Sequence, residues 1–214
     1  CSRCWPLCLK NSPSPPTTRR APASGWGATV TADLAADGGG GSTQGSVIVT
    51  GPENIMMAAV LAEGRTILEN AAREPEVVEV SKALNKMGAK VQGAGTDIVV
   101  IDGVEELRPV EYTIMSDRIE AGTLMVAAGI TQGNLKLLNC DLAQMEAVVA
   151  KLREAGLEIF PDGEGVKVIG PVNIKAVDVK TLPFPGFPTD MQAQIMALMC
   201  LANGLSVITE TVFE

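Results

Sequence analysis

The chain has 214 residues, of which 46% are hydrophobic and 3% aromatic, and its formal net charge at pH 7 is −8. This length fits one large domain or two small ones, and the acidic balance without a basic stripe argues against a nucleic-acid-binding protein. The longest mostly apolar windows, residues 55–62 and 195–202, fall well short of a membrane span, which needs roughly 20 residues. We therefore expect a soluble protein that binds neither nucleic acid nor a membrane.

Histidine is absent from the sequence. Ser-His-Asp and Cys-His nucleophile systems and histidine metal sites are thereby excluded, so Asp, Glu, Lys, Arg, Tyr or Cys must carry any acid–base chemistry. The five cysteines are an odd number without framework spacing, which favours a reduced, cytoplasmic protein. Neither a metal site nor a cofactor is predicted.

Residues 1–45 differ in composition from the rest of the chain. Pro, Ser, Thr and Gly dominate in "NSPSPPTTRRAPASG" and "DGGGGSTQG", and apolar periodicity is almost absent. Such a segment buries too little apolar surface to offset the entropy of ordering the chain. We expect residues 1–45 to be a disordered or unrelated N-terminal segment.

Three apolar helices are predicted next, with starts about seventy residues apart at Thr50, Asp117 and Thr189. Each start carries Glu or Gln three residues later, the spacing of a capping box that satisfies free amides at a helix start. The helical runs are rich in Ala and Met and apolar all round, which is typical of helices covered on every side. Each run closes at a glycine suited to a left-handed backbone. These glycines are Gly64, Gly133 and Gly204.

The segments after these glycines also repeat. "RTILEN", "NLKLLN" and "LSVITE" alternate apolar and polar residues, as half-buried strands do. Second helices are predicted over residues 74–88 and 141–156, the latter starting with a further capping pair, Asp141 and Gln144. A strand pair with a Gly-rich turn comes after each of these helices. The unit of about seventy residues occurs twice in full and a third time in part, up to Glu214.

Several segments resemble one family. The words "AAREPEV", "SDRIEAGTLMVAA", "FPTDMQAQ" and "ITETVFE" are similar to those of the UDP-N-acetylglucosamine 1-carboxyvinyltransferases, a family of enolpyruvyl transferases. The resemblance covers residues 46–214 and implies an α/β fold, an inside-out α/β barrel built from repeated βαβαββ units and here incomplete. It implies that residues 46–115 are the last unit of a first barrel domain. Residues 116–214 are then the first one and a half units of a second, truncated domain.

The same resemblance implies an activity, transfer of the enolpyruvyl group from phosphoenolpyruvate to the 3'-hydroxyl of UDP-N-acetylglucosamine in peptidoglycan precursor synthesis. For Asp190 the residues alone suggest a plain role, a carboxylate in the first turn of a helix capped by Thr189. Three aligned helix starts near one cleft also favour anions such as substrate phosphates. The resemblance makes Asp190 the base that takes the proton of the accepting hydroxyl.

Other site residues are implied by the resemblance with less support. The nucleotide pocket is expected to involve Ser46, Val47, Ile48, Val49, Val212 and Phe213, with Ser46 standing where the family usually has lysine. A strand end is the plain alternative for Val212 and Phe213. Pocket or hinge roles are expected for Arg118, Arg73 and Glu74, although such charges are usually solvated helix-start residues.

Parts of the family's site have no counterpart in this sequence. The Lys-Asn pair that holds phosphoenolpyruvate, the cysteine loop that serves as general acid and a late arginine are all missing. The chain by itself is therefore expected to be inactive. Two alternatives remain open, a non-catalytic remnant or binding module that keeps the fold units, and a related shikimate-pathway enolpyruvyl transferase.

Overall fold

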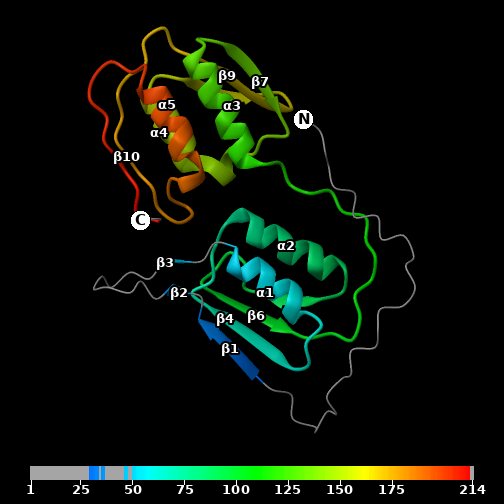
Figure 1. Ribbon diagram of the computed structural model, residues 1–214. Helices are drawn as coiled ribbons and strands as arrows, with labels where there is room; N and C mark the ends of the chain where they lie inside the picture. Colours follow the sequence, from blue (N-terminus) through cyan, green and yellow to red (C-terminus); the bar gives the residue numbers. More distant parts are fainter. Residues whose placement is uncertain (1–28, 34, 37–45, 48–49, 213–214) are drawn as a thin grey trace, which may run out of the picture.

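The computed structural model describes residues 29–33, 35–36, 46–47 and 50–212 (Figure 1). The chain forms two α/β units, one from residue 29 to 102 and one from residue 118 to 209, joined by residues 103–117 without helix or strand. Each unit has its own cluster of buried apolar side chains. We call them the first unit and the second unit.

The first unit is a four-stranded sheet that packs against two helices. The strand order is β1-β4-β6-β5, with β1 parallel to β4 and the other neighbours antiparallel. Leu68, Val99 and Ile101 are fully buried in its core. The elements are β1 (Thr29–Asp33), α1 (Gly51–Ala59), β4 (Arg65–Glu69), α2 (Pro75–Lys86), β5 (Lys90–Gln92) and β6 (Ile98–Asp102). A short antiparallel pair, β2 (Ala35–Ala36) and β3 (Ser46–Val47), precedes α1.

The second unit repeats this arrangement with one strand fewer. Its sheet has the order β7-β9-β8, which matches β4-β6-β5 of the first unit. Among the described residues, no strand pairs with the other edge of β7 as β1 pairs with β4. The elements are α3 (Arg118–Ile130), β7 (Asn134–Leu138), η1 (Leu142–Met145), α4 (Glu146–Glu154), β8 (Glu158–Asp162) and β9 (Gly165–Ile169). The repeat predicted from the sequence is confirmed for these elements.

The third, partial copy packs onto the second unit. Its strands, β10 (Val179–Lys180) and β11 (Ile208–Thr209), are parallel and lie on either side of η2 (Thr189–Met191) and α5 (Gln192–Met199) in the chain. This order, strand, helix, parallel strand, is that of β1, α1 and β4. Helix α5 contacts α3 closely, because a Cβ on Gly129 would lie 3.0 Å from Leu198.

The predicted caps are correct for the aspartates and wrong for the threonines. Asp117 accepts hydrogen bonds from the backbone N–H groups of Ile119 and Glu120, and Asp141 accepts one from Ala143. Thr50 makes no such bond because its backbone is already helical, with φ −87° and ψ −7°, whereas a cap needs an extended residue. Thr189 is not the cap because Pro188 occupies that position and Thr189 is the first residue of η2, with its hydroxyl donating to Glu210.

The prediction that each apolar helix ends at a glycine is also partly wrong. Gly64 and Gly204 have left-handed φ values of 92° and 121°, but both lie beyond the last helical turn. After α3 the left-handed residue is Gln132 rather than Gly133. The helices are therefore shorter than the apolar runs from which they were predicted.

The expectation for residues 1–45 does not hold throughout. Thr29–Asp33 form β1, which pairs in parallel with all five residues of β4. Residues 35–36 form β2. Strand β1 therefore supplies the first strand of the unit that was expected to begin at residue 46. The rest of the segment, residues 1–28, 34 and 37–45, lies outside the described residues.

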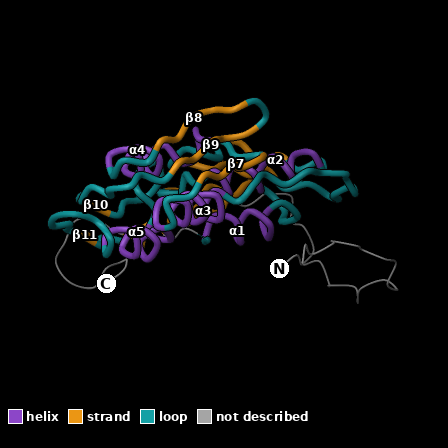
Figure 2. Tube along the Cα trace, turned by 90° about the horizontal axis from the view of Figure 1, so that it is seen from above, coloured by secondary structure: helices purple, strands orange, loops and turns teal. Residues whose placement is uncertain are grey.

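The apolar helices are not covered on every side by the described residues. Exposed fractions are 51% for Met57 of α1, 42% for Leu124 of α3 and 48% for Met196 of α5. Figure 2 shows these three helices along one side of the molecule. No helix in the described part of the chain is long and apolar enough to cross a membrane.

We expect the purified chain to associate and to bind an apolar-surface dye, because large exposed apolar patches promote association. Replacing Met57, Leu124 and Met196 by glutamine should lower both dye fluorescence and self-association. Val172, which is 78% exposed in the loop after β9, offers a control whose replacement by glutamine should change little. The prediction would be contradicted if the unmodified chain were monomeric and did not bind the dye.

Candidate active site

Asp190 lies at the end of the second unit that faces the first. It comes directly after a tight loop, in which the N–H of Leu182 donates to the carbonyl of Phe187 at 2.9 Å and that of Gly186 to Pro183 at 2.8 Å. A Cβ on Gly186 would lie 2.4 Å from the Cβ of Leu182, so this turn requires glycine. The loop therefore fixes the backbone path into η2 and Asp190.

A buried arginine connects this loop to the first unit. Arg118, at the start of α3, is 8% exposed, and its guanidinium donates to the carboxylate of Glu76 in α2 at 2.9 and 3.2 Å. The guanidinium also lies over the ring of Phe184, with its carbon 5.7 Å from the ring centroid. A paired and stacked guanidinium is a typical interface contact. These contacts join α2, α3 and the loop before Asp190.

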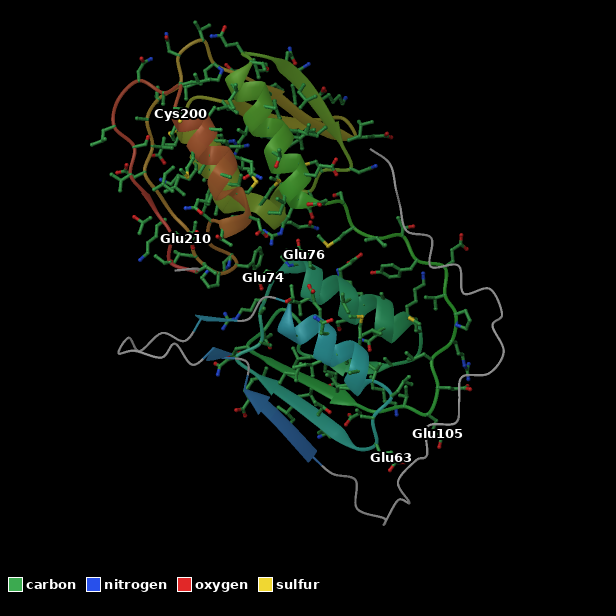
Figure 3. The ribbon with its side chains drawn as sticks, viewed as in Figure 1. Glu63, Glu74, Glu76, Glu105, Cys200 and Glu210 are labelled. Atoms are coloured by element: carbon green, nitrogen blue, oxygen red, sulfur yellow. The ribbon has the colours of Figure 1, made fainter. Side chains whose placement is uncertain are left out.

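Carboxylates gather on the first-unit side of this junction (Figure 3). Glu74 is 5% exposed, and its Oε2 has no hydrogen-bond partner within the described residues. Burial raises the pKa of Glu53 in the first turn of α1, and the neighbouring charges of Glu76 and Glu74 raise it further. The starts of α1 and α2 are therefore close enough to interact electrostatically.

Glu74, Arg118, Asp190 and Val212 line one small cavity. Its volume is about 30 Å³, room for one or two water molecules. A larger hollow of about 270 Å³ lies beside it, lined by Arg73, Glu74 and Phe184 among others. The structure thus brings four of the predicted site residues together and places Arg73 next to them. These residues line open hollows rather than a closed pocket.

The remaining predicted residues are not brought into this cavity by the described part of the chain. Ser46 and Val47 form β3, while Ile48, Val49 and Phe213 lie outside the described residues. Arg73 forms an ion pair with Asp97 at 3.8 Å, and both side chains are largely exposed.

The described residues do not complete the anion site expected at the helix starts. Arg118 is the one cation among the residues that line the cavity of Asp190, and Glu76 already binds it. The described cysteines, Cys140 and Cys200, do not line this cavity. Burial and the charge of Asp141 raise the pKa of the Cys140 thiol, which lies in a separate hollow between η1 and β9.

The sequence matches the family model described as EPSP synthase (3-phosphoshikimate 1-carboxyvinyltransferase) over residues 37–214. The chain belongs to the EPSP synthase family. A member of this family from Geotalea daltonii, a UDP-N-acetylglucosamine 1-carboxyvinyltransferase, is 58% identical over 166 residues, which are 78% of this chain and 40% of that protein. The enzyme of the same name from Myxococcus xanthus is 55% identical over 176 residues, 82% of this chain and 42% of that protein.

A solved structure supports the α/β fold of this EPSP synthase family member. The enolpyruvyl transferase NikO from Streptomyces tendae matches with a TM-score of 0.68 and 19% identity over 87% of this chain and 45% of that one. The resemblance predicted from the sequence is confirmed by these relatives. The chain spans about two fifths of the length of the curated relatives it matches.

Proposed function

We propose that the chain is part of a UDP-N-acetylglucosamine 1-carboxyvinyltransferase. In this reaction the enolpyruvyl group of phosphoenolpyruvate is transferred to the 3'-hydroxyl of UDP-N-acetylglucosamine, and phosphate is released. The observation that supports the proposal best is Asp190, held at the start of η2 and lining a cavity between the two units with Val212. The name of the relatives at 55–58% identity agrees with it.

Asp190 suits the role of a general base. The accepting hydroxyl must lose its proton as its oxygen bonds to the central carbon of phosphoenolpyruvate, and a carboxylate within hydrogen-bond reach accepts that proton. The Asp190 side chain is exposed, so a substrate hydroxyl has access to it. In the same addition the methylene carbon gains a proton from an acid. Loss of phosphate from the central carbon and of a proton from the methylene carbon then restores the double bond and leaves the enolpyruvyl ether.

The other site residues complete the proposal. Residues 46–49 with Val212 and Phe213 are assigned to the nucleotide and sugar, and Arg118, Arg73 and Glu74 to the pocket wall and the hinge between the units. The parts of the protein that the relatives have and this chain lacks are assigned the phosphoenolpyruvate-binding lysine and the cysteine acid. The reaction belongs to peptidoglycan precursor synthesis in the cytoplasm.

The architecture is proposed on the same basis. The first unit, through residue 115, is the last βαβαββ unit of one inside-out barrel, and residues 116–214 begin a second barrel. Within the described residues, α1, α3 and α5 have open faces and one edge of β7 is unpaired. These features support the arrangement, because further units would cover them.

A chimera tests the activity. Residues 46–214 replace the matching segment of the Geotalea daltonii relative, and phosphate release from phosphoenolpyruvate is measured with each of two acceptors. We expect release that depends on UDP-N-acetylglucosamine, and none from the isolated chain. Release with 3-phosphoshikimate alone would instead support the activity in the family's name. A folded chimera inactive with both acceptors would point to a non-catalytic module.

A further inference from the structure

Glu210, directly after β11, binds two hydroxyls from distant parts of the chain and one nearby amide with one carboxylate. Its Oε1 accepts from the hydroxyl of Thr181 at 2.7 Å and from the N–H of Val212 at 2.6 Å. Its Oε2 accepts from the hydroxyl of Thr189 at 2.8 Å. Figure 3 shows Glu210 at the end of the second unit that faces the first, whereas Glu74 and Glu76 lie at the facing end of the first unit. An ionised carboxylate can only accept hydrogen bonds, and the two hydroxyls and the amide all donate to it.

Each donor belongs to a part of the candidate site. Thr189 is the residue before Asp190, and Val212 lines the cavity of Asp190. Thr181 is fully buried at the start of the tight loop, and its hydroxyl accepts a further bond from the N–H of Thr211 at 2.9 Å. Hydrogen bonds to a charged acceptor are shorter and about twice as strong as neutral ones. Glu210 therefore joins both ends of the loop to the strand that leads to Val212.

Asp190 depends on its backbone for its position. Within the described residues its carboxylate makes no hydrogen bond or ion pair, and η2 has only three residues. The N–H of Met191 donates to the carbonyl of Pro188 at 3.1 Å, which closes this single turn. The two neighbours of Asp190 anchor this turn: Met191 is fully buried in the core of the second unit, and the hydroxyl of Thr189 is bonded to Glu210.

We infer that Glu210 is a positioning residue, which holds the turn of Asp190 and the Val212 segment in the relative placement that the transfer reaction needs. The inference rests on the proposed function. Glu210 does not touch substrate in this role and acts through Thr189 and Val212. A misplacement of about 1 Å at a reacting group costs on the order of 10²-fold in rate.

Four variants of the Geotalea chimera and one control test the role. Glu210→Ala removes all three bonds and should lower kcat by about 10- to 100-fold. Thr189→Val removes the link to Asp190 alone and should lower kcat with little change in KM for UDP-N-acetylglucosamine. The double variant should be no slower than Glu210→Ala, because both changes break the same link. Glu210→Gln keeps the Oε1 acceptor for Thr181 and Val212, and its amide N–H can donate to the Thr189 hydroxyl in place of the bond that Oε2 accepts. This variant should therefore recover most of the lost rate. Glu158→Ala, on exposed β8, serves as the control without effect.

A second readout needs no activity. In the chain itself the amide of Val212 is bonded to Glu210, so its hydrogen exchange should be slow in the parent and in Glu210→Gln and fast in Glu210→Ala. Parental exchange and parental kcat in Glu210→Ala would overturn the inference. Additive losses in the double variant, or full activity in Thr189→Val, would overturn it too. An inactive parental chimera would refute the proposed function. Hydrogen exchange at Val212 would still show whether Glu210 holds the Val212 amide.

Discussion

Replacing Asp190 by asparagine in the Geotalea chimera should lower turnover by about 10²-fold or more, the usual loss when a positioned base is removed. Asparagine keeps the size of the side chain and its preference for a helix start, but it cannot take up the proton of the sugar hydroxyl. The melting temperature should stay nearly unchanged. Asp190 is exposed and its carboxylate has no bond within the described residues, so folding should change by less than about 1 kcal/mol, the scale of a dipole contact.

The measurement is phosphate release from phosphoenolpyruvate, with UDP-N-acetylglucosamine as acceptor, beside a melting curve for each variant. Asp141→Asn is a matched control, because Asp141 also begins a short helix and lies outside the cavity of Asp190. This control should keep its turnover. If Asp190→Asn turns over near the parental rate, Asp190 serves only the helix start and the assignment of the base is wrong.

The elements that the sequence predicted are those with a local pattern. Strands β4 and β7 alternate apolar and polar residues, and α2 has its apolar residues three and four apart, so each could be recognised from its own segment. Strands β1 and β10 were missed. β1 lies in a Gly- and Pro-rich region and pairs with β4, more than thirty residues away, and β10 has two residues. Their place is determined by distant partners rather than by local periodicity.

In the candidate site, too, the contacts between residues close in sequence were predicted and those between distant residues were not. Asp117 and Asp141 cap their helices through bonds that span two or three residues, and these were predicted. The bonds of Glu210 to Thr189 and Thr181 span 21 and 29 residues, and no spacing in the sequence indicates them. Thr189 was predicted as a cap, but the residue before η2 is Pro188, and the Thr189 hydroxyl takes part in this distant bond. Asp190 itself was singled out by resemblance, because a carboxylate at a helix start is otherwise an ordinary feature.

The second unit should lose much of its stability when Ile195 is replaced by alanine. Ile195 is fully buried in the core shared by α3, α4 and α5, and such a truncation costs about 2–5 kcal/mol from lost burial and the cavity left behind. Met196 is the next residue and is 48% exposed. Its replacement by alanine should cost less than about 1 kcal/mol, since it packs against little. Chemical unfolding followed by circular dichroism compares the two variants.

Because the two units have separate cores, the loss from Ile195→Ala should stay within one of them. Amide exchange should accelerate in β7 and β9, while the buried strands β4 and β6 of the first unit keep their parental exchange. The polar contacts of the junction are the Arg118–Glu76 ion pair, whose carboxylate is partly exposed, and a long bond of 3.5 Å from the N–H of Phe184 to Glu74. Partly exposed ion pairs contribute only about 0–1 kcal/mol. We expect these contacts to be too weak to make the units unfold together. Equal acceleration in both units would show instead that the junction makes them one cooperative structure.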